Sequence, residues 1–379
     1  MIGRLLALVP LLVVAGCGGG SAGGHGGASR PPSPLSAPSW TATGAAARPA
    51  PLRGVPLAGA TGLVLVVSAD PPFLFDVDTG RITPVTGLRV HGRGPVLSVL
   101  AVGRDAVIWV DRRPLATGIP DYGIYLVRHG QARAQRIAAG SGVQPAAGGR
   151  AVWVTSFTGA HHCTLREINL AGRRLRGPRP VPCSAALTGP GGGGLLVEGR
   201  TVIDPATGRV LLHASSLWAI AGHLALTVGG PLHPLTLTDL ATGARRALRW
   251  PSPIGGPQAG ADQAAVAPGG KLIALSFSDP AYEGTGVQVT DVWLLDPGTG
   301  RWQQLPGMPA DVALKFTSMS WTADGRLVML AQTPTSGSAP HDVIAVWRPG
   351  EKSLAIRSVH IPARESGSDS FVAWVRPTT

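Results

Sequence analysis

The most constraining feature of this sequence is a five-residue turn motif, Asp-x-x-Thr-Gly, that recurs along much of the chain. It occurs at residues 76–80, 204–208, 239–243 and 296–300. The aspartate side chain can accept backbone N–H groups of a turn, and the glycine supplies the positive φ angle that closes a tight hairpin. Weaker versions centre on Gly130, Gly172 and Gly350, and the mean spacing of the series is about 45 residues. This period is typical of a β-propeller built from repeated sheets.

One complete copy of the repeat lies between residues 262 and 305. It contains four short segments, at 263–267, 271–277, 287–295 and 301–305, of which the first is apolar and the second is β-rich and alternating. Such segments, separated by turns, predict four antiparallel strands in up-and-down order, which form one propeller blade. We therefore expect an all-β fold, a seven-bladed β-propeller of four-stranded antiparallel blades. Six or eight blades are the alternative counts.

Two turns between the first and second strands of the repeat carry a family resemblance. Trp321-Thr-Ala-Asp-Gly-Arg-Leu327 and Ala267-Pro-Gly-Gly-Lys-Leu-Ile-Ala274 resemble the WSPDG-type repeats of TolB-like, WD40-like propellers. The first lacks the proline of the family pattern, and the second has glycine in place of the aspartate. The resemblance implies this architecture from about Leu63 onward, and such a fold implies no particular activity.

The two ends of the repeat region predict how the ring closes. Segments 63–67, 73–75 and 82–85 supply only three strands for the first blade, and the chain finishes with another apolar segment, 370–375. A C-terminal strand that completes the first blade would close the circle and remove its open edges.

Residues 1–16 are similar to a bacterial lipoprotein signal peptide with its lipobox. Arg4 precedes a short apolar run, and the small residues Ala15 and Gly16 lead to Cys17. The resemblance implies cleavage before Cys17, acylation of that cysteine by lipids such as palmitate, and anchoring in the cell membrane on its extracytoplasmic side. An ordinary secretory signal and an uncleaved anchor are the alternatives, and both also export the protein.

Three regions follow from this reading. After the signal peptide, residues 17–56 are rich in glycine, alanine, serine and proline, which predicts a flexible, lipidated tether. Residues 57–379 are then the propeller domain.

Export favours a disulfide between Cys163 and Cys183, because an oxidising compartment permits it and acylation of Cys17 removes the third thiol. Both cysteines lie near the open end of one predicted hairpin. A metal site formed by His161, His162 and Cys163 is the alternative, although no second ligand pair stands at zinc-like spacing. We expect neither a metal nor a cofactor.

The net charge of +12 comes almost entirely from arginine. A basic protein favours anionic partners such as lipid headgroups, acidic polymers or nucleic acid. Many arginines fall in the predicted fourth strands, where edge charge prevents strand-to-strand aggregation, so edge protection and a polyanion-binding surface both remain open. Export, and the lack of aromatic residues among the basic loops, argue against nucleic acid.

The loops that join second to third strands, and those that join blades, are longer and more varied than the turns. We therefore expect binding at that end of the propeller, where arginines and histidines could hold a carboxylate, phosphate or sulfate. Ordinary solvated loop residues are the alternative interpretation. The candidate ligand-binding residues are His91, Arg93, Arg112, Arg113, His161, His162, Asp279, Tyr282 and Glu283.

No H-E-x-x-H, P-loop or C-x-x-C motif occurs in the sequence. We predict no catalytic residues, and a monomeric, membrane-anchored module that binds or scaffolds an envelope protein or an anionic polymer. A propeller enzyme of the lyase, hydrolase or quinoprotein type is the alternative. It would need acid and base groups, such as Asp279 and Glu283, gathered at one mouth of the ring.

Overall fold

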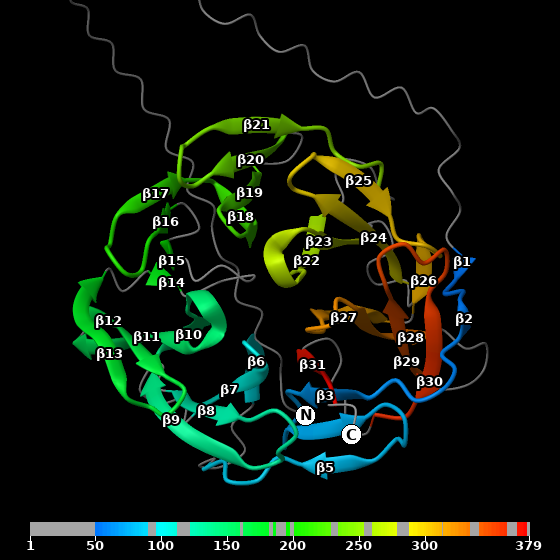
Figure 1. Ribbon diagram of the computed structural model, residues 1–379, viewed down its shortest axis with the longest axis horizontal. Coiled ribbons are helices and arrows are strands. Elements are labelled where there is room, and N and C mark those ends of the chain that lie inside the picture. The colour runs from blue at the N-terminus through cyan, green and yellow to red at the C-terminus, as the bar shows by residue number, and fades with distance from the viewer. Residues whose placement is uncertain are drawn as a thin grey trace, which may run out of the picture. The chain divides into compact units, whose positions relative to one another are not determined.

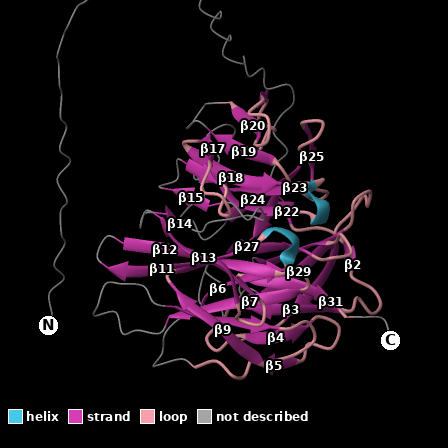
Figure 2. Ribbon diagram, turned by 60° about the vertical axis from the view of Figure 1, so that its left-hand side comes forward, coloured by secondary structure: helices cyan, strands magenta, loops and turns pink. Residues whose placement is uncertain are grey.

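The computed structural model describes residues 50–376, apart from 90–95, 112–121, 160–161, 182–184, 187–194, 198–200, 229–233, 254–259, 279–287, 313, 334–340 and 362–369. The predicted signal peptide, Cys17 and most of the tether lie outside the described residues. In the described part, strands predominate and the helical segments are two short 3-10 turns, Ala147–Gly149 and Pro268–Gly270 (Figure 2). The strands form seven sheets that follow one another in a ring (Figure 1). The predicted all-β propeller fold is confirmed.

Five sheets have four antiparallel strands each, ordered from the innermost strand to the outermost. The first sheet is β31 (Phe371–Val375), β3 (Leu63–Val67), β4 (Phe73–Asp76) and β5 (Ile82–Pro84). The second is β6 (Val96–Val102), β7 (Asp105–Asp111), β8 (Tyr122–Val127) and β9 (Ala134–Gly140). The third is β10 (Gly142–Pro145), β11 (Ala151–Gly159), β12 (His162–Asn169) and β13 (Arg174–Val181). The fourth is β14 (Ala185–Ala186), β15 (Leu195–Val197), β16 (Thr201–Ile203) and β17 (Val210–His213). The fifth is β18 (Ser216–Ala221), β19 (Leu224–Val228), β20 (Leu235–Asp239) and β21 (Arg245–Leu248).

The remaining two sheets carry additional strands. The sixth contains β22 (Gly260–Val266), β23 (Ile273–Ser278), β24 (Gln288–Asp296), β25 (Arg301–Gln304), β26 (Ala310–Val312) and β1 (Ala50–Pro51). The seventh contains β27 (Leu314–Trp321), β28 (Leu327–Thr333), β29 (His341–Trp347), β30 (Ala355–Val359) and β2 (Val55–Pro56). The four-strand unit predicted between 262 and 305 is confirmed as β22 to β25.

Three short strands were not predicted from the sequence. β26 pairs with the first half of β24, beside β25. β1 then pairs in parallel with β26, and β2 pairs in parallel with β30. These two-residue strands lie in the range expected to form the tether. They cover the outer edges of the sixth and seventh sheets, which would otherwise offer free backbone groups.

The ring closes through its two ends, as the sequence predicts. β31 pairs antiparallel with β3, from Leu63 opposite Val375 to Val67 opposite Phe371. Figure 1 shows this red strand beside the blue strand of the first sheet. The C-terminal strand therefore supplies the innermost position that the N-terminal part of the repeat region lacks.

Apolar side chains fill the spaces between neighbouring sheets. Seven clusters of buried residues in the described part join each sheet to both of its neighbours. Inner strands are therefore buried on both faces, and all five residues of β3 are buried. This explains why its sequence, Leu-Val-Leu-Val-Val, is uniformly apolar rather than alternating.

The recurring turns have the hydrogen bonds that the motif predicts. Asp76 Oδ1 accepts the backbone N–H groups of Asp78 and Thr79 at 3.0 and 3.2 Å. Asp239, Asp204 and Asp296 accept equivalent bonds in their own turns. Gly80 has a φ of +69°, a backbone conformation that costs a residue with a side chain about 1–2 kcal/mol.

Arginines in three outer strands reach across to the turn of the next sheet, and we call these contacts inter-sheet clamps. A guanidinium of this kind donates hydrogen bonds to backbone carbonyl oxygens of the neighbouring turn. The clamps are Arg179 to Asp204 O at 3.3 Å, Arg246 to Pro297 O at 2.6 Å and Gly298 O at 3.1 Å, and Arg357 to Val77 O at 2.9 Å. Some arginines therefore connect neighbouring sheets of the ring. This role differs from the two predicted for them, edge protection and polyanion binding.

The predicted disulfide can be tested directly. Cys163 is buried in β12 and lies opposite Val181 in β13. Cys183 lies outside the described residues, so its pairing with Cys163 stays a prediction. We expect peptide mapping of the unreduced protein to recover one linked pair. Replacing both cysteines by serine should lower the free energy of unfolding by about 3 kcal/mol, the value expected for a loop of about 20 residues. Recovery of Cys163 and Cys183 in separate, unlinked peptides of the unreduced protein would contradict the pairing.

Candidate functional site

Most of the loop residues predicted to bind a ligand lie outside the described part of the chain. Only His162 is described, at the start of β12, where it is exposed. Whether these loops converge therefore stays a prediction. The candidate residues that lie outside the described part are His91, Arg93, Arg112, Arg113, His161, Asp279, Tyr282 and Glu283. Among the described residues, no group of three or more His, Cys, Asp or Glu side chains is arranged to hold a metal ion.

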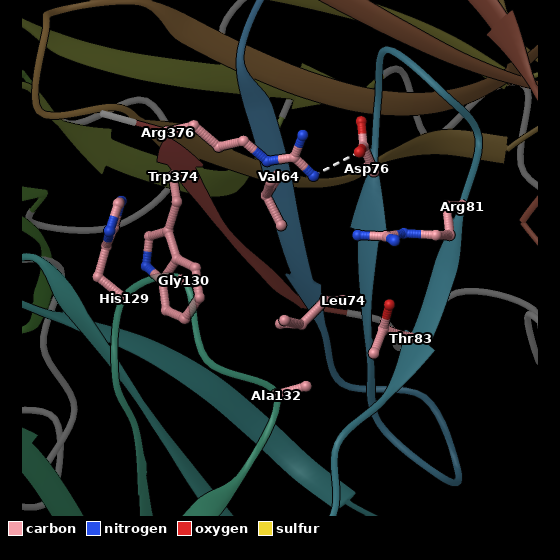
Figure 3. A pocket seen from close by; sticks show the side chains of 10 residues that line it. All are labelled: Val64, Leu74, Asp76, Arg81, Thr83, His129, Gly130, Ala132, Trp374 and Arg376. Atoms are coloured by element: carbon pink, nitrogen blue, oxygen red, sulfur yellow. Dashed lines mark hydrogen bonds and ion pairs between the residues drawn. The ribbon is translucent and has the colours of Figure 1, made fainter. Parts of the chain in front are cut away.

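A small cleft opens at the opposite end of the ring, between the first and second sheets (Figure 3). The turn after β4 forms one side, and the turn between β8 and β9 forms the other. Its volume is about 140 Å³. The cleft is lined by Val64, Leu74, Asp76, Arg81, Thr83, His129, Gly130, Ala132, Trp374 and Arg376.

The apolar wall of the cleft belongs to the core between the two sheets. Val64, Leu74 and Trp374 extend from the buried cluster that also contains Ile108. The His129 ring packs against Trp374, with ring centroids 5.2 Å apart.

Hydrogen bonds on both sides of His129 hold this wall in place. His129 Nε2 lies 2.8 Å from Val375 O, and the backbone N–H of His129 donates to Asp105 Oδ1 at 2.9 Å. The wall is therefore fixed by both sheets rather than by one flexible loop.

Two charged residues of the cleft neutralise each other. Arg376 follows β31 and forms an ion pair with Asp76 at the end of β4 (Figure 3). Burial alone would raise the pKa of Asp76, but hydrogen bonds from Thr79 and the bond and charge of Arg376 together lower the pKa below its usual value. Asp76 therefore stays ionised at neutral pH and balances the charge of Arg376.

Arg81 supplies a second guanidinium that has no such partner. It follows the turn directly, and Figure 3 shows its side chain pointing into the cleft between Asp76 and Thr83. No hydrogen bond or ion pair joins its guanidinium to another described residue, and its backbone N–H donates to Thr79 Oγ1 at 3.3 Å. The cleft thus presents one uncompensated cation beside a hydroxyl group and an apolar wall. A guanidinium in this setting can hold a carboxylate or phosphate through two parallel hydrogen bonds.

The sequence did not identify this cleft, although two signals were present. Arginine directly follows the turn glycine at Arg81, Arg209 and Arg301. Arg376 stands one residue beyond the predicted closing strand. Neither signal shows that the next sheet supplies His129, so the combination could not be predicted.

The turn aspartates predict how stability depends on pH. Burial on its own would raise the pKa of Asp78, but its hydrogen bonds with Thr61, Gly62 and Arg357 lower the pKa below 3.8. A carboxylate whose folded pKa is depressed stabilises the fold fully above its unfolded value, and this contribution is lost as pH falls through the folded pKa. The pKa of five further aspartates is also lowered, at Asp76, Asp204, Asp239, Asp296 and Asp324.

We therefore expect the free energy of unfolding to stay level near neutral pH and to fall below about pH 3.8. Urea unfolding at pH 7, 4 and 3 measures this. An Asp78→Asn variant should start from a lower stability and lose less of it on acidification. An equal loss in the variant would contradict the assignment.

Comparisons with known proteins give no family. No known family model matches the sequence, and no curated protein matches it. Among solved structures, TolB from Acinetobacter baumannii is 14% identical, with a TM-score of 0.42, over 83% of this chain and 68% of that one. The β-propeller domain of the Trilobed protease from Pyrococcus furiosus is 10% identical, with a TM-score of 0.48, over 81% and 96%. Puromycin hydrolase is 17% identical, with a TM-score of 0.38, over 76% and 50%.

At these identities and TM-scores the likenesses support no conclusion about activity, and the architecture of this chain rests on its own strand pairing. In the described residues, no helix has the length and apolar character needed to cross a bilayer.

Proposed function

We propose that this chain is a membrane-anchored, extracytoplasmic propeller that binds an acidic group of an envelope protein or an anionic polymer. The cleft between the first and second sheets is one of its contact sites. The observation that carries this proposal is the Arg81 guanidinium, which points into the cleft without a carboxylate partner among the described residues. Lipid anchoring through Cys17 and export are supported by the sequence.

The composition of the cleft favours a carboxylate carried on a short aliphatic stem. Arg81 and the Thr83 hydroxyl supply donors on one side, and Leu74 and Trp374 supply apolar contact on the other. The cleft is too small for a drug-sized ligand, which needs about 300 Å³ or more. It therefore suits a side chain or a terminal group that a larger partner presents.

Titration with a simple acidic peptide tests the proposal. The protein is the full chain with Cys17→Ser, and the probes are hexaglutamate and, as the neutral control, hexaglutamine. Calorimetry should show binding of hexaglutamate that weakens as the salt concentration is raised from about 0.05 to about 0.3 M. This range includes the physiological ionic strength, at which charges are screened over about 8 Å.

Two arginine variants separate the cleft from general charge. Arg81→Met should weaken hexaglutamate binding about tenfold or more, since a charged hydrogen bond contributes about 1.5–3 kcal/mol. Arg301→Met is the matched control, because Arg301 is exposed and also follows the glycine of an Asp-x-x-Thr-Gly turn. No binding by the parent chain, or equal weakening in both variants, would reject the cleft as the site.

Membrane anchoring has its own test. Cells that express the chain should incorporate labelled palmitate into it, and Cys17→Ser should abolish the labelling and release the protein from the membrane fraction. Unchanged membrane attachment in Cys17→Ser would leave the lipidation proposal without support.

We also propose that the ring consists of seven blades, one for each described sheet. Seven sheets and seven inter-sheet apolar clusters in the described residues support this count. In an experimental structure, six sheets around the axis would overturn it.

A further inference from the structure

We infer that Asp78 and Arg357 are positioning residues of the cleft, so that ligand affinity depends on the contact between the seventh sheet and the first. This inference rests on the proposed function of the cleft. Neither residue lines it. Both act through a series of connected hydrogen bonds that reaches the two cleft arginines, Arg81 and Arg376.

Arg357 lies in β30 and spans three parts of the chain. Its Nη1 donates to Val77 O at 2.9 Å and to Asp78 Oδ1 at 3.1 Å. Its Nη2 donates to Leu57 O at 2.7 Å and to Gly59 O at 3.1 Å. The side chains of the ion pair are 24% and 18% exposed, so this pair is largely shielded from water. Arg357 therefore fixes the first-sheet turn and the segment before β3 to one another.

Asp78 accepts hydrogen bonds from that same segment. Its Oδ1 accepts the backbone N–H of Thr61 at 2.9 Å and the Thr61 hydroxyl at 2.7 Å. Its Oδ2 accepts the N–H of Gly62 at 2.7 Å. Both carboxylate oxygens are thus in use, and the position of Gly62 follows from that of Asp78.

Gly62 carries the connection to the cleft. Its carbonyl oxygen accepts the backbone N–H of Arg376 at 2.8 Å, and Arg376 in turn pairs with Asp76. Asp76 Oδ1 accepts the N–H of Asp78 at 3.0 Å, so these hydrogen bonds form a ring that returns to Asp78. The backbone N–H of Asp76 also donates to Arg81 O at 2.9 Å. These hydrogen bonds therefore hold in place the backbone of Arg81 and Arg376, from which both cleft guanidinium groups extend.

Loss of either positioning residue should weaken binding without removing any ligand contact. Without Arg357 the turn and the segment before β3 lose their common donor, and without the Asp78 carboxylate the N–H of Gly62 loses its acceptor. In either case Arg81 and Arg376 would sample more positions in the free protein. Ordering them on binding would then reduce the affinity, by about five- to tenfold for one or two long side chains.

The experiment titrates hexaglutamate into the full Cys17→Ser chain carrying Arg357→Met. Arg246→Met is the matched control, because Arg246 forms an equivalent clamp from the fifth sheet to the sixth-sheet turn, away from the cleft. We expect both variants to lose stability, while only Arg357→Met binds about five- to tenfold more weakly. Asp78→Asn, which keeps the side-chain shape, should weaken binding in the same direction.

Three results decide the matter. Equal weakening in Arg357→Met and Arg246→Met would show a general effect of lost stability and overturn the inference. Parent-like affinity in a folded Arg357→Met or Asp78→Asn variant would overturn it too, and would leave the proposed function intact. Failure of the parent chain to bind hexaglutamate would instead reject the proposed function, and this inference with it.

Discussion

A chain that stops after Asp369 is expected not to form the native ring, whereas one that stops after Arg376 is expected to fold normally. The first truncation removes β31 and leaves β3 as an exposed inner edge. It also removes buried side chains from two apolar clusters, since Phe371 and Ala373 pack towards the seventh sheet and Trp374 packs towards the second. Losing one buried tryptophan costs about 3–5 kcal/mol, and a whole domain is stable by only about 5–15 kcal/mol.

Expression of both truncations and urea unfolding measure this effect. The shorter chain should aggregate or unfold without cooperativity, because the unpaired edge of β3 can join another molecule. Trp374→Ala is a milder version and should cost about 3–5 kcal/mol. Cooperative unfolding of the shorter chain at parent-like urea concentrations would show that ring closure contributes little.

Replacing Arg357 by methionine is expected to lower the free energy of unfolding by about 2–3 kcal/mol. Breaking a fully buried ion pair costs about 3–5 kcal/mol, and the value here is smaller because both side chains retain some exposure. The change also leaves the carbonyl oxygens of Val77 and Leu57 without their guanidinium donor. Methionine keeps most of the apolar stem, so the loss reports the charged end of the side chain.

Urea unfolding of Arg357→Met, Asp78→Asn and the double variant measures this loss and its origin. The double variant should be more stable than the sum of the single losses predicts, with a coupling energy of about 1–2 kcal/mol. Arg209→Met is the control, since Arg209 is exposed and only its backbone forms a hydrogen bond among the described residues, so it should change stability by less than about 0.5 kcal/mol. Additive losses would mean that the two residues act separately.

The structure also divides the arginines by role, which net charge alone could not do. Arg179, Arg246 and Arg357 are inter-sheet clamps, and Arg376 pairs with Asp76. Arg81 remains as the cation that faces the cleft. A count of basic residues therefore overstates the charge available to a partner.

The sequence by itself determined the repeated turns, the strands between them and the closing strand. In the turn at Asp76, the hydrogen bonds to the aspartate side chain join residues only two or three positions apart, so five adjacent residues are enough to predict the turn. The need for a last strand followed from a first blade with three segments and a final apolar segment. These features are local, or follow from the repeat itself.

Only the tertiary structure decided the edge strands β1 and β2, the inter-sheet clamps and the cleft. Two-residue strands carry no periodic pattern, and Arg357 meets Val77 across 280 positions of sequence. The candidate site combines Arg81, His129 and Arg376, which become neighbours only when the ring closes. A long-range contact of this kind depends on the stacking of whole sheets, because burial of their apolar faces fixes which turns meet.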